Sequence, residues 1–249
     1  MRYKKILIIT FSLLFSGILL PSIFNICKAS SQAAENPAIE KAEAQATCFL
    51  GEKVNSFPFY VYKDADFGEN NFSPTGMMGD FSDYGVNSSC KESPYAGSSC
   101  IKIVYLHKLK QVYGWSGLYW QYPPNNWGNI PKAYDLTAAT KLTFWARGKD
   151  GGEVINKFQV GGITGKYRDS GIVSIGPITL SKKWTKYTIN LRNMDNSIIV
   201  SNEDKDCWPF AEPLSRIIGG FCWATSLTGN NNYNHGITFY LDEIRFEND

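Results

Sequence analysis

Residues 237–246 read Ile-Thr-Phe-Tyr-Leu-Asp-Glu-Ile-Arg-Phe, and this stretch decides the fold class. Its first half alternates, with the apolar Ile237, Phe239 and Leu241 at every second position and Thr238 between them. In an extended chain, residues two apart point to the same face of a sheet. The stretch therefore predicts a long β-strand with one face turned toward a hydrophobic core.

Similar runs recur along the chain after residue 48, and clusters of Gly, Pro, Asn, Asp and Ser separate them. No amphipathic helix of three turns stands out, and strands do not alternate with helices. Short strands at this spacing predict an all-β sandwich or barrel. The segments with the strongest strand signal are residues 57–62, 101–107, 117–121, 141–147, 158–162, 184–191, 217–223 and 237–246.

The N-terminus has the composition of a secretory signal peptide, which we place at residues 1–29. Basic residues precede an apolar run over residues 6–20, and Pro21 ends this run. The run is short for a membrane-spanning helix, and small residues suited to cleavage follow it. An uncleaved signal anchor over residues 6–26 is the alternative. We therefore expect an exported protein, located outside the cytoplasm.

Cleavage after residue 29 removes four basic residues and no acidic one, so the formal net charge changes from +2 to −2. No basic patch remains that would favour nucleic acid or an anionic membrane as a partner. We expect neither partner, and no membrane span once the signal peptide is cleaved. Residues 30–47 lack aromatics and read as a polar linker, whereas residues 48–249 are enough for a single domain with a sizeable core.

The cysteines indicate disulfides if the protein is exported. Cys90 and Cys100 flank a turn-rich loop, and Cys207 and Cys222 bracket a second loop that contains two prolines. In an oxidising compartment we predict two local bridges, each worth about 2–4 kcal/mol in the chain-entropy model. Cys48 is left over, and the sequence does not decide whether it is free or paired.

Residues 114–128 are the strongest candidate for a ligand site, because they contain five aromatic residues, two Asn and one Gln. Aromatic faces stack on the C–H patches of sugar rings, and side-chain amides bond to hydroxyls. The alternative is that these rings are ordinary core of an all-β domain. Alternation places Tyr119 and Trp120 on opposite faces, so one of them is expected to be core. The predicted glycan contacts in this stretch are Trp115, Tyr119, Trp120, Gln121, Asn125, Asn126 and Trp127.

Two further candidates lie on the predicted strand 141–147. Leu142, Phe144 and Ala146 point one way, so Trp145 and Arg147 point the other way. We therefore predict that both line a concave sheet face and contact the glycan. An arginine stacked on an aromatic ring is the structural alternative.

Three segments resemble strands of the galactose-binding-like β-jelly-roll superfamily. Residues 134–148 look like a central strand, residues 184–191 are similar to its W-x-x-Y-x-I-x-L strand, and residues 237–246 resemble its closing strand. Many secreted carbohydrate-binding modules share all three. The resemblance covers roughly residues 57–247 and implies a two-sheet antiparallel β-sandwich (jelly roll) with a bias toward glycan binding, although a fold does not fix a function.

The resemblance also implies a structural calcium ion. In such modules an Asp of the closing strand, here Asp242, is often a ligand together with oxygens near the first strand, where Asp64 and Asp66 lie. Calcium takes about six to eight oxygens, and two or three carboxylates with backbone carbonyls would suffice. The alternative is that these carboxylates are solvated turn and strand-end residues.

An enzyme is a competing class, but the residues do not favour it. A glycosidase needs two carboxyls across a cleft, and Glu69, Glu153 and Glu243 form no recognisable motif. His107 and His235 accompany no nucleophile or zinc signature. We expect a non-catalytic secreted protein that holds polysaccharide by stacking and amide hydrogen bonds. A cell-surface protein-docking sandwich and a polysaccharide-degrading jelly-roll enzyme are the alternatives.

Overall fold

The computed structural model describes residues 50–106, 108, 110–195, 212–226 and 236–249. The predicted signal peptide, the predicted linker, Cys48 and Cys207 lie outside these residues. Within the described ranges, none of the helices combines the length and the apolar character that crossing a membrane requires.

The described residues form strands and two short 3-10 helices. In chain order the elements are β1 (Glu52–Lys53), β2 (Phe59–Tyr62), β3 (Ser73–Gly79), η1 (Phe81–Asp83), β4 (Tyr84–Cys90), β5 (Cys100–Tyr105), β6 (Trp115–Gln121), β7 (Tyr134–Asp135), β8 (Lys141–Gly148), β9 (Val154–Ile155), β10 (Lys157–Gly161), β11 (Ile172–Ile175), β12 (Ile178–Thr179), β13 (Thr185–Asn190), η2 (Leu191–Asn193), β14 (Gly219–Ser226) and β15 (Ile237–Glu247). All predicted strands are present, with ends that differ by a few residues.

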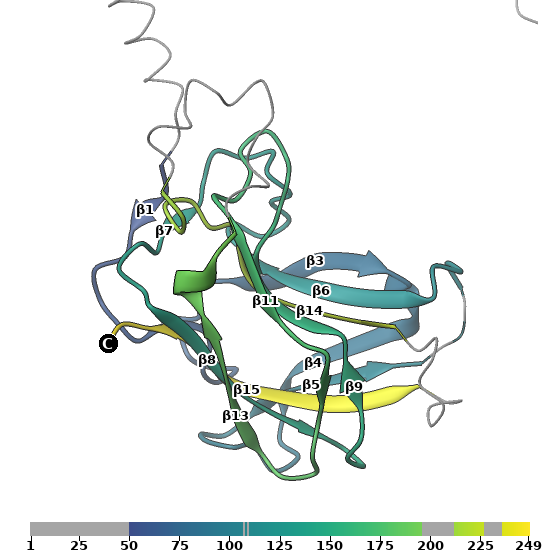
Figure 1. Ribbon diagram of the computed structural model, residues 1–249. Helices are drawn as coiled ribbons and strands as arrows, with labels where there is room; N and C mark the ends of the chain where they lie inside the picture. Colours follow the sequence, from purple (N-terminus) through teal and green to yellow (C-terminus); the bar gives the residue numbers. More distant parts are fainter. Residues whose placement is uncertain (1–49, 107, 109, 196–211, 227–235) are drawn as a thin grey trace, which may run out of the picture. The chain divides into compact units, whose positions relative to one another are not determined.

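Two large antiparallel sheets dominate the fold (Figure 1), and β1 with β7 and β12 with β9 form two further two-stranded sheets, the first of them parallel. The five-stranded sheet has the order β11-β10-β14-β6-β3, and the six-stranded sheet has the order β13-β8-β15-β5-β4 with β2 as its sixth strand. The long strand β15 pairs with β8 on one side, and with β5 and then β2 on the other. This arrangement confirms the predicted two-sheet antiparallel β-sandwich.

The core lies between the inner faces of the two sheets. Ile237, Phe239 and Leu241 of β15 are buried there, as the alternation predicted, and so are the apolar residues of β8. Trp223 of β14, on the opposite sheet, packs edge to face against Phe239 with 5.2 Å between ring centroids. The residues between these inward-pointing ones therefore face away from the main core, on the outer faces of the two sheets.

Three of the strands that the sequence did not predict lie at the edges of the two large sheets. β3 and β11 are the two edges of the five-stranded sheet, and β4 is an edge of the six-stranded sheet. Edge strands are half-solvated, so they carry less apolar signal and tolerate Gly and Pro. β3, for example, reads Ser-Pro-Thr-Gly-Met-Met-Gly.

Candidate functional site

The outer face of the five-stranded sheet carries the aromatic residues that the sequence singled out. Leu118 and Trp120 of β6 point into the main core, and Trp120 is only 1% exposed. Trp115 and Tyr119 therefore lie on the outer face, where Trp115 is 38% exposed and Tyr119 belongs to a separate small cluster. The prediction that Tyr119 and Trp120 face opposite ways is confirmed. Trp120 is a core residue, so its predicted glycan contact is wrong.

Trp127 returns to the same face after a tight reversal of the chain. Asn125 and Gly128 on either side of it have left-handed backbones, with φ of 61° and 79°. The Trp127 indole contacts Tyr119 edge to face, with 6.0 Å between ring centroids, and stays 41% exposed. We call Trp115, Tyr119 and Trp127 the aromatic platform. Tyr119 is only 5% exposed, so the two indoles are the rings of the platform that water reaches.

A chain of polar side chains lies beside the platform on β10. Lys157 Nζ donates to Gln159 Oε1 at 2.9 Å, and Gln159 Nε2 donates to the Tyr119 hydroxyl. The hydroxyl in turn donates to the carbonyl of Gly161 at 3.0 Å. Burial raises the pKa of Tyr119 well above its ordinary value, so this hydroxyl stays protonated. An ammonium has three N–H donors, so Lys157 can also donate to a ligand.

Sequence reasoning missed Lys157 and Gln159, although a signal was present. Phe158 and Val160 alternate with Gln159 in the predicted strand 158–162. This pattern places Gln159 opposite the core face, and in the sheet β10 pairs with β14, which in turn pairs with the platform strand β6. What the sequence does not contain is the strand order that makes β10 a neighbour of that surface.

Two predicted amide contacts turn out to be structural. Asn126 is fully buried, and its Nδ2 donates to the carbonyls of Tyr122, Ile130 and Lys132 at 3.0–3.3 Å. Gln121 is also fully buried and donates to the carbonyl of Asn126 at 2.9 Å. Both amides are buried and donate to backbone carbonyls of the chain reversal that contains Trp127. Their predicted contact with glycan is therefore wrong. The exposed Asn125 remains a candidate.

Trp145 and Arg147 lie on the other outer face of the sandwich, that of the six-stranded sheet. Trp145 stacks on Tyr95 with 3.7 Å between centroids, and the Arg147 guanidinium lies 3.7 Å from the ring centroid of Tyr240. Arg147 Nη2 also donates to the carbonyl of Glu92 at 2.8 Å. Trp145 and Arg147 therefore do not share a face with Trp115. The alternative of a stacked arginine is confirmed, and the contact of the two residues with glycan stays a prediction.

The carboxylates predicted to bind calcium hold the loop between β4 and β5. Asp242 is buried, and its two oxygens accept N–H groups of Tyr95, Ala96 and Glu243 at 2.8–3.2 Å. Burial raises its pKa to about 6.

The second predicted ligand has the same structural role. Asp64 accepts the N–H of Ser98 at 2.7 Å and the Ser98 hydroxyl at 3.0 Å, whereas Asp66 is exposed. Over the described ranges, no three His, Cys, Asp or Glu residues gather as metal ligands. The carboxylate oxygens of Asp242, Asp64 and Asp66 therefore do not form a calcium site by themselves. The ion stays a prediction, which the melting temperature with and without a chelator tests.

The structure describes both cysteines of one predicted disulfide and one cysteine of the other. Cys90 and Cys100 lie directly opposite each other across β4 and β5, both buried and both as free thiols. Cys222 is a buried free thiol next to Tyr119, and its predicted partner lies outside the described residues. Burial raises the pKa of Cys222 to about 12, so it stays a protonated thiol. Both bridges stay predictions.

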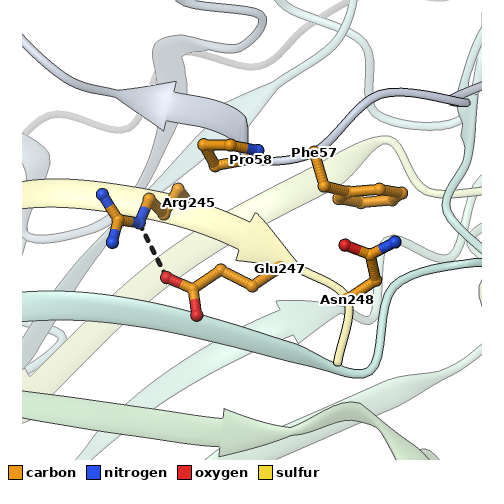
Figure 2. A pocket seen from close by; sticks show the side chains of 5 residues that line it. All are labelled: Phe57, Pro58, Arg245, Glu247 and Asn248. Atoms are coloured by element: carbon orange, nitrogen blue, oxygen red, sulfur yellow. Dashed lines mark hydrogen bonds and ion pairs between the residues drawn. The ribbon is translucent and has the colours of Figure 1, made fainter.

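A hollow of about 350 Å³ lies at the end of β15 (Figure 2), and no platform residue lines it. Phe57 and Pro58 line one side, and Arg245, Glu247 and Asn248 line the other. Arg245 is bound to Glu247 at 2.7 Å and to a second carboxylate at 2.9 Å. The Arg245 donors are thus engaged within the protein, which leaves the exposed Asn248 amide as the polar group of the hollow with no such ion pair.

Comparisons with known proteins give similarities to solved structures alone. No protein-family model and no curated protein matches the chain. A family 30 carbohydrate-binding module of the cellulosomal cellulase Cel9D-Cel44B of Clostridium thermocellum is 14% identical, with 78% of this chain and 99% of that chain covered and a TM-score of 0.45. The family 11 module of Lic26A-Cel5E of the same organism is 13% identical, with 76% and 94% covered and a TM-score of 0.44. A family 29 module is 11% identical, with 77% and 92% covered and a TM-score of 0.39.

Proposed function

We propose that the protein is an exported, non-catalytic carbohydrate-binding protein that holds glycan on the aromatic platform. One observation carries this proposal: Trp115 and Trp127 stay 38% and 41% exposed on the same sheet face. Packing of the core does not explain why the indoles of Trp115 and Trp127 remain exposed while Tyr119 beside them is buried. Their free faces can stack on the apolar C–H patches of sugar rings.

The spacing of the rings favours an extended glycan over a single sugar. Trp115 and Tyr119 are four residues apart on β6, which corresponds to about 13 Å along a strand. Trp127 contacts Tyr119, so the two indoles stand at the two ends of this interval. Such an open surface stays hydrated on binding, and we expect modest affinity.

The groups around the platform support binding without catalysis. Lys157 and Asn125 offer donors and an amide to hydroxyls. The carboxylate near Tyr119 is Asp169, which is 3% exposed and accepts the N–H groups of Ile163 and Ile218. Among the described residues of the platform there is thus no pair of free carboxyls for a glycosidase mechanism.

Affinity electrophoresis through gels that contain soluble polysaccharides tests the proposal. A suitable panel is mixed-linkage β-glucan, xyloglucan, glucomannan and xylan. We expect at least one gel to retard the wild-type protein, and Trp115→Ala or Trp127→Ala to weaken binding about tenfold or more. Trp184→Ala is the matched control, because this half-buried indole lies on the six-stranded sheet.

Three results would contradict the proposal. Retardation that survives both platform substitutions would remove the platform from the site, and wild-type protein that no gel retards would favour the protein-docking alternative. Release of reducing ends or unsaturated products from the same polysaccharides would instead indicate an enzyme. Export is tested separately, by N-terminal sequencing of the protein recovered outside the cytoplasm.

A further inference from the structure

The segment that leads into β6 exposes large apolar side chains next to Trp115. Val112 is 74% exposed and Tyr113 is 65% exposed. Val112 also has a φ of 65°, in the left-handed region that β-branched residues rarely adopt. A backbone of this kind persists only where its surroundings hold it, and such positions gather at binding sites.

A buried carboxylate holds this backbone. Asp80 is fully buried, and its Oδ1 accepts the N–H of Tyr113 at 2.8 Å while its Oδ2 accepts the N–H of Gly114 at 2.9 Å. The Tyr105 hydroxyl donates to the same Oδ2 at 3.2 Å. The backbone N–H of Asp80 donates to the carbonyl of Trp115 at 2.8 Å. One residue therefore orients Tyr113 and the start of the platform strand together.

A second buried carboxylate holds the preceding part of the segment. Asp83 is 3% exposed, and its Oδ2 accepts the N–H groups of Lys108 and Lys110 at 3.0 and 3.3 Å. Gln111 bonds to Ser82 through both ends of its amide. Hydrogen bonds therefore hold the backbone of the segment that exposes Val112 and Tyr113. Because this backbone is already ordered, binding a ligand costs little conformational entropy.

We propose that Tyr113 is a third ring of the glycan site and contacts the sugar chain beyond Trp115. This inference rests on the proposed function. The Cα atoms of Tyr113 and Trp115 lie within about 7 Å, the most that two residues of extended chain can span. A tyrosine offers a ring face for stacking and a hydroxyl for hydrogen bonds to sugar. Tyr113 therefore extends the platform at the end opposite to Trp127.

The test compares Tyr113→Ala with Tyr95→Ala on the same polysaccharide gels. Tyr95 is a matched control, because it is 43% exposed but stacks on Trp145 of the other sheet. We expect Tyr113→Ala to weaken binding about tenfold, with the melting temperature unchanged because its side chain is largely solvated. Tyr113→Phe, which keeps the ring, should retain most of the affinity, and Tyr95→Ala should bind as the wild type does.

The outcomes separate this inference from the proposed function. Wild-type affinity in Tyr113→Ala, together with loss in Trp115→Ala, would overturn the role of Tyr113 and leave the platform in place. Equal losses in Tyr113→Ala and Tyr95→Ala would also overturn that role. A wild-type protein that no gel retards would overturn the proposed function and this inference with it.

Discussion

The indole of Trp127 stands edge-on against the ring of Tyr119, with their centroids 6.0 Å apart and their planes at 86°. Tyr119 is 5% exposed, packed in a cluster with Ile163 and Ile218, whereas Trp127 is 41% exposed. Tyr119 therefore supports the ring that a glycan would meet, and does not itself face the ligand. The position of Trp127 depends in turn on the loops packed around it.

Gly165→Ala should displace Trp127 through one of those loops. A methyl group at this position would meet the carbonyl oxygen of Trp127 and lie 2.7 Å from the Cα of Gly128, and backbone cannot yield as a side chain can. We expect the free energy of unfolding to fall by about 1–3 kcal/mol and glycan affinity to fall with it. Urea denaturation and affinity gels measure the two effects. Gly68→Ala is the control, because open space surrounds it; equal behaviour of the two variants would contradict the prediction.

Asn126→Ala should destabilise the fold strongly. The Asn126 amide donates to three carbonyls, and its Oδ1 accepts the N–H groups of Gly128 and Ile130 at 3.0 and 3.1 Å. Leaving buried groups without partners costs about 1–3 kcal/mol each, so we expect a loss of several kcal/mol in chemical denaturation. Asn125→Gly, at an exposed left-handed position, should be nearly neutral. A neutral Asn126→Ala would show that water replaces these bonds.

Asp169 should make stability depend on pH. Burial raises its pKa to about 6 from 3.8, so the folded protein keeps a proton that the unfolded chain has released. This contribution to the free energy of unfolding is fully present below about pH 4 and is lost as the pH rises through about 6. Asp169→Asn cannot titrate. The stability of the wild type relative to this variant should therefore shrink by roughly 2 kcal/mol between pH 4 and pH 7. A difference that grows with pH would show that the backbone donors outweigh burial.

Cys90 and Cys100 should form a disulfide if the protein is exported as proposed. They are cross-strand partners at the base of the loop that Asp64 and Asp242 hold. Peptide mapping without reductant should find them linked, and reduction should lower the free energy of unfolding by about 2–4 kcal/mol. Cys90→Ser should remove the effect of the reductant on this loop. Recovery of both as alkylated thiols from non-reduced protein would contradict the prediction.

The sequence alone was sufficient for the fold class and for the inward faces of the strongest strands. Alternation in residues 237–246 and 141–147 follows directly from the geometry of an extended chain. The same alternation within residues 117–121 correctly placed Trp120 and Tyr119 on opposite faces. It was weakest at β3, β4 and β11. Water contacts one side of these edge strands, so their side chains need less apolar character.

The tertiary structure decided which of the candidate residues share a surface. Alternation shows that Trp145 and Trp115 both point away from the core, but not that β8 and β6 belong to different sheets. Strand order arises from pairing between segments far apart in the chain, such as β8 with β15 and β6 with β14. In the same way, composition placed an amide at Asn126, and only the folded loop turned it inward, because buried backbone groups require hydrogen-bond partners.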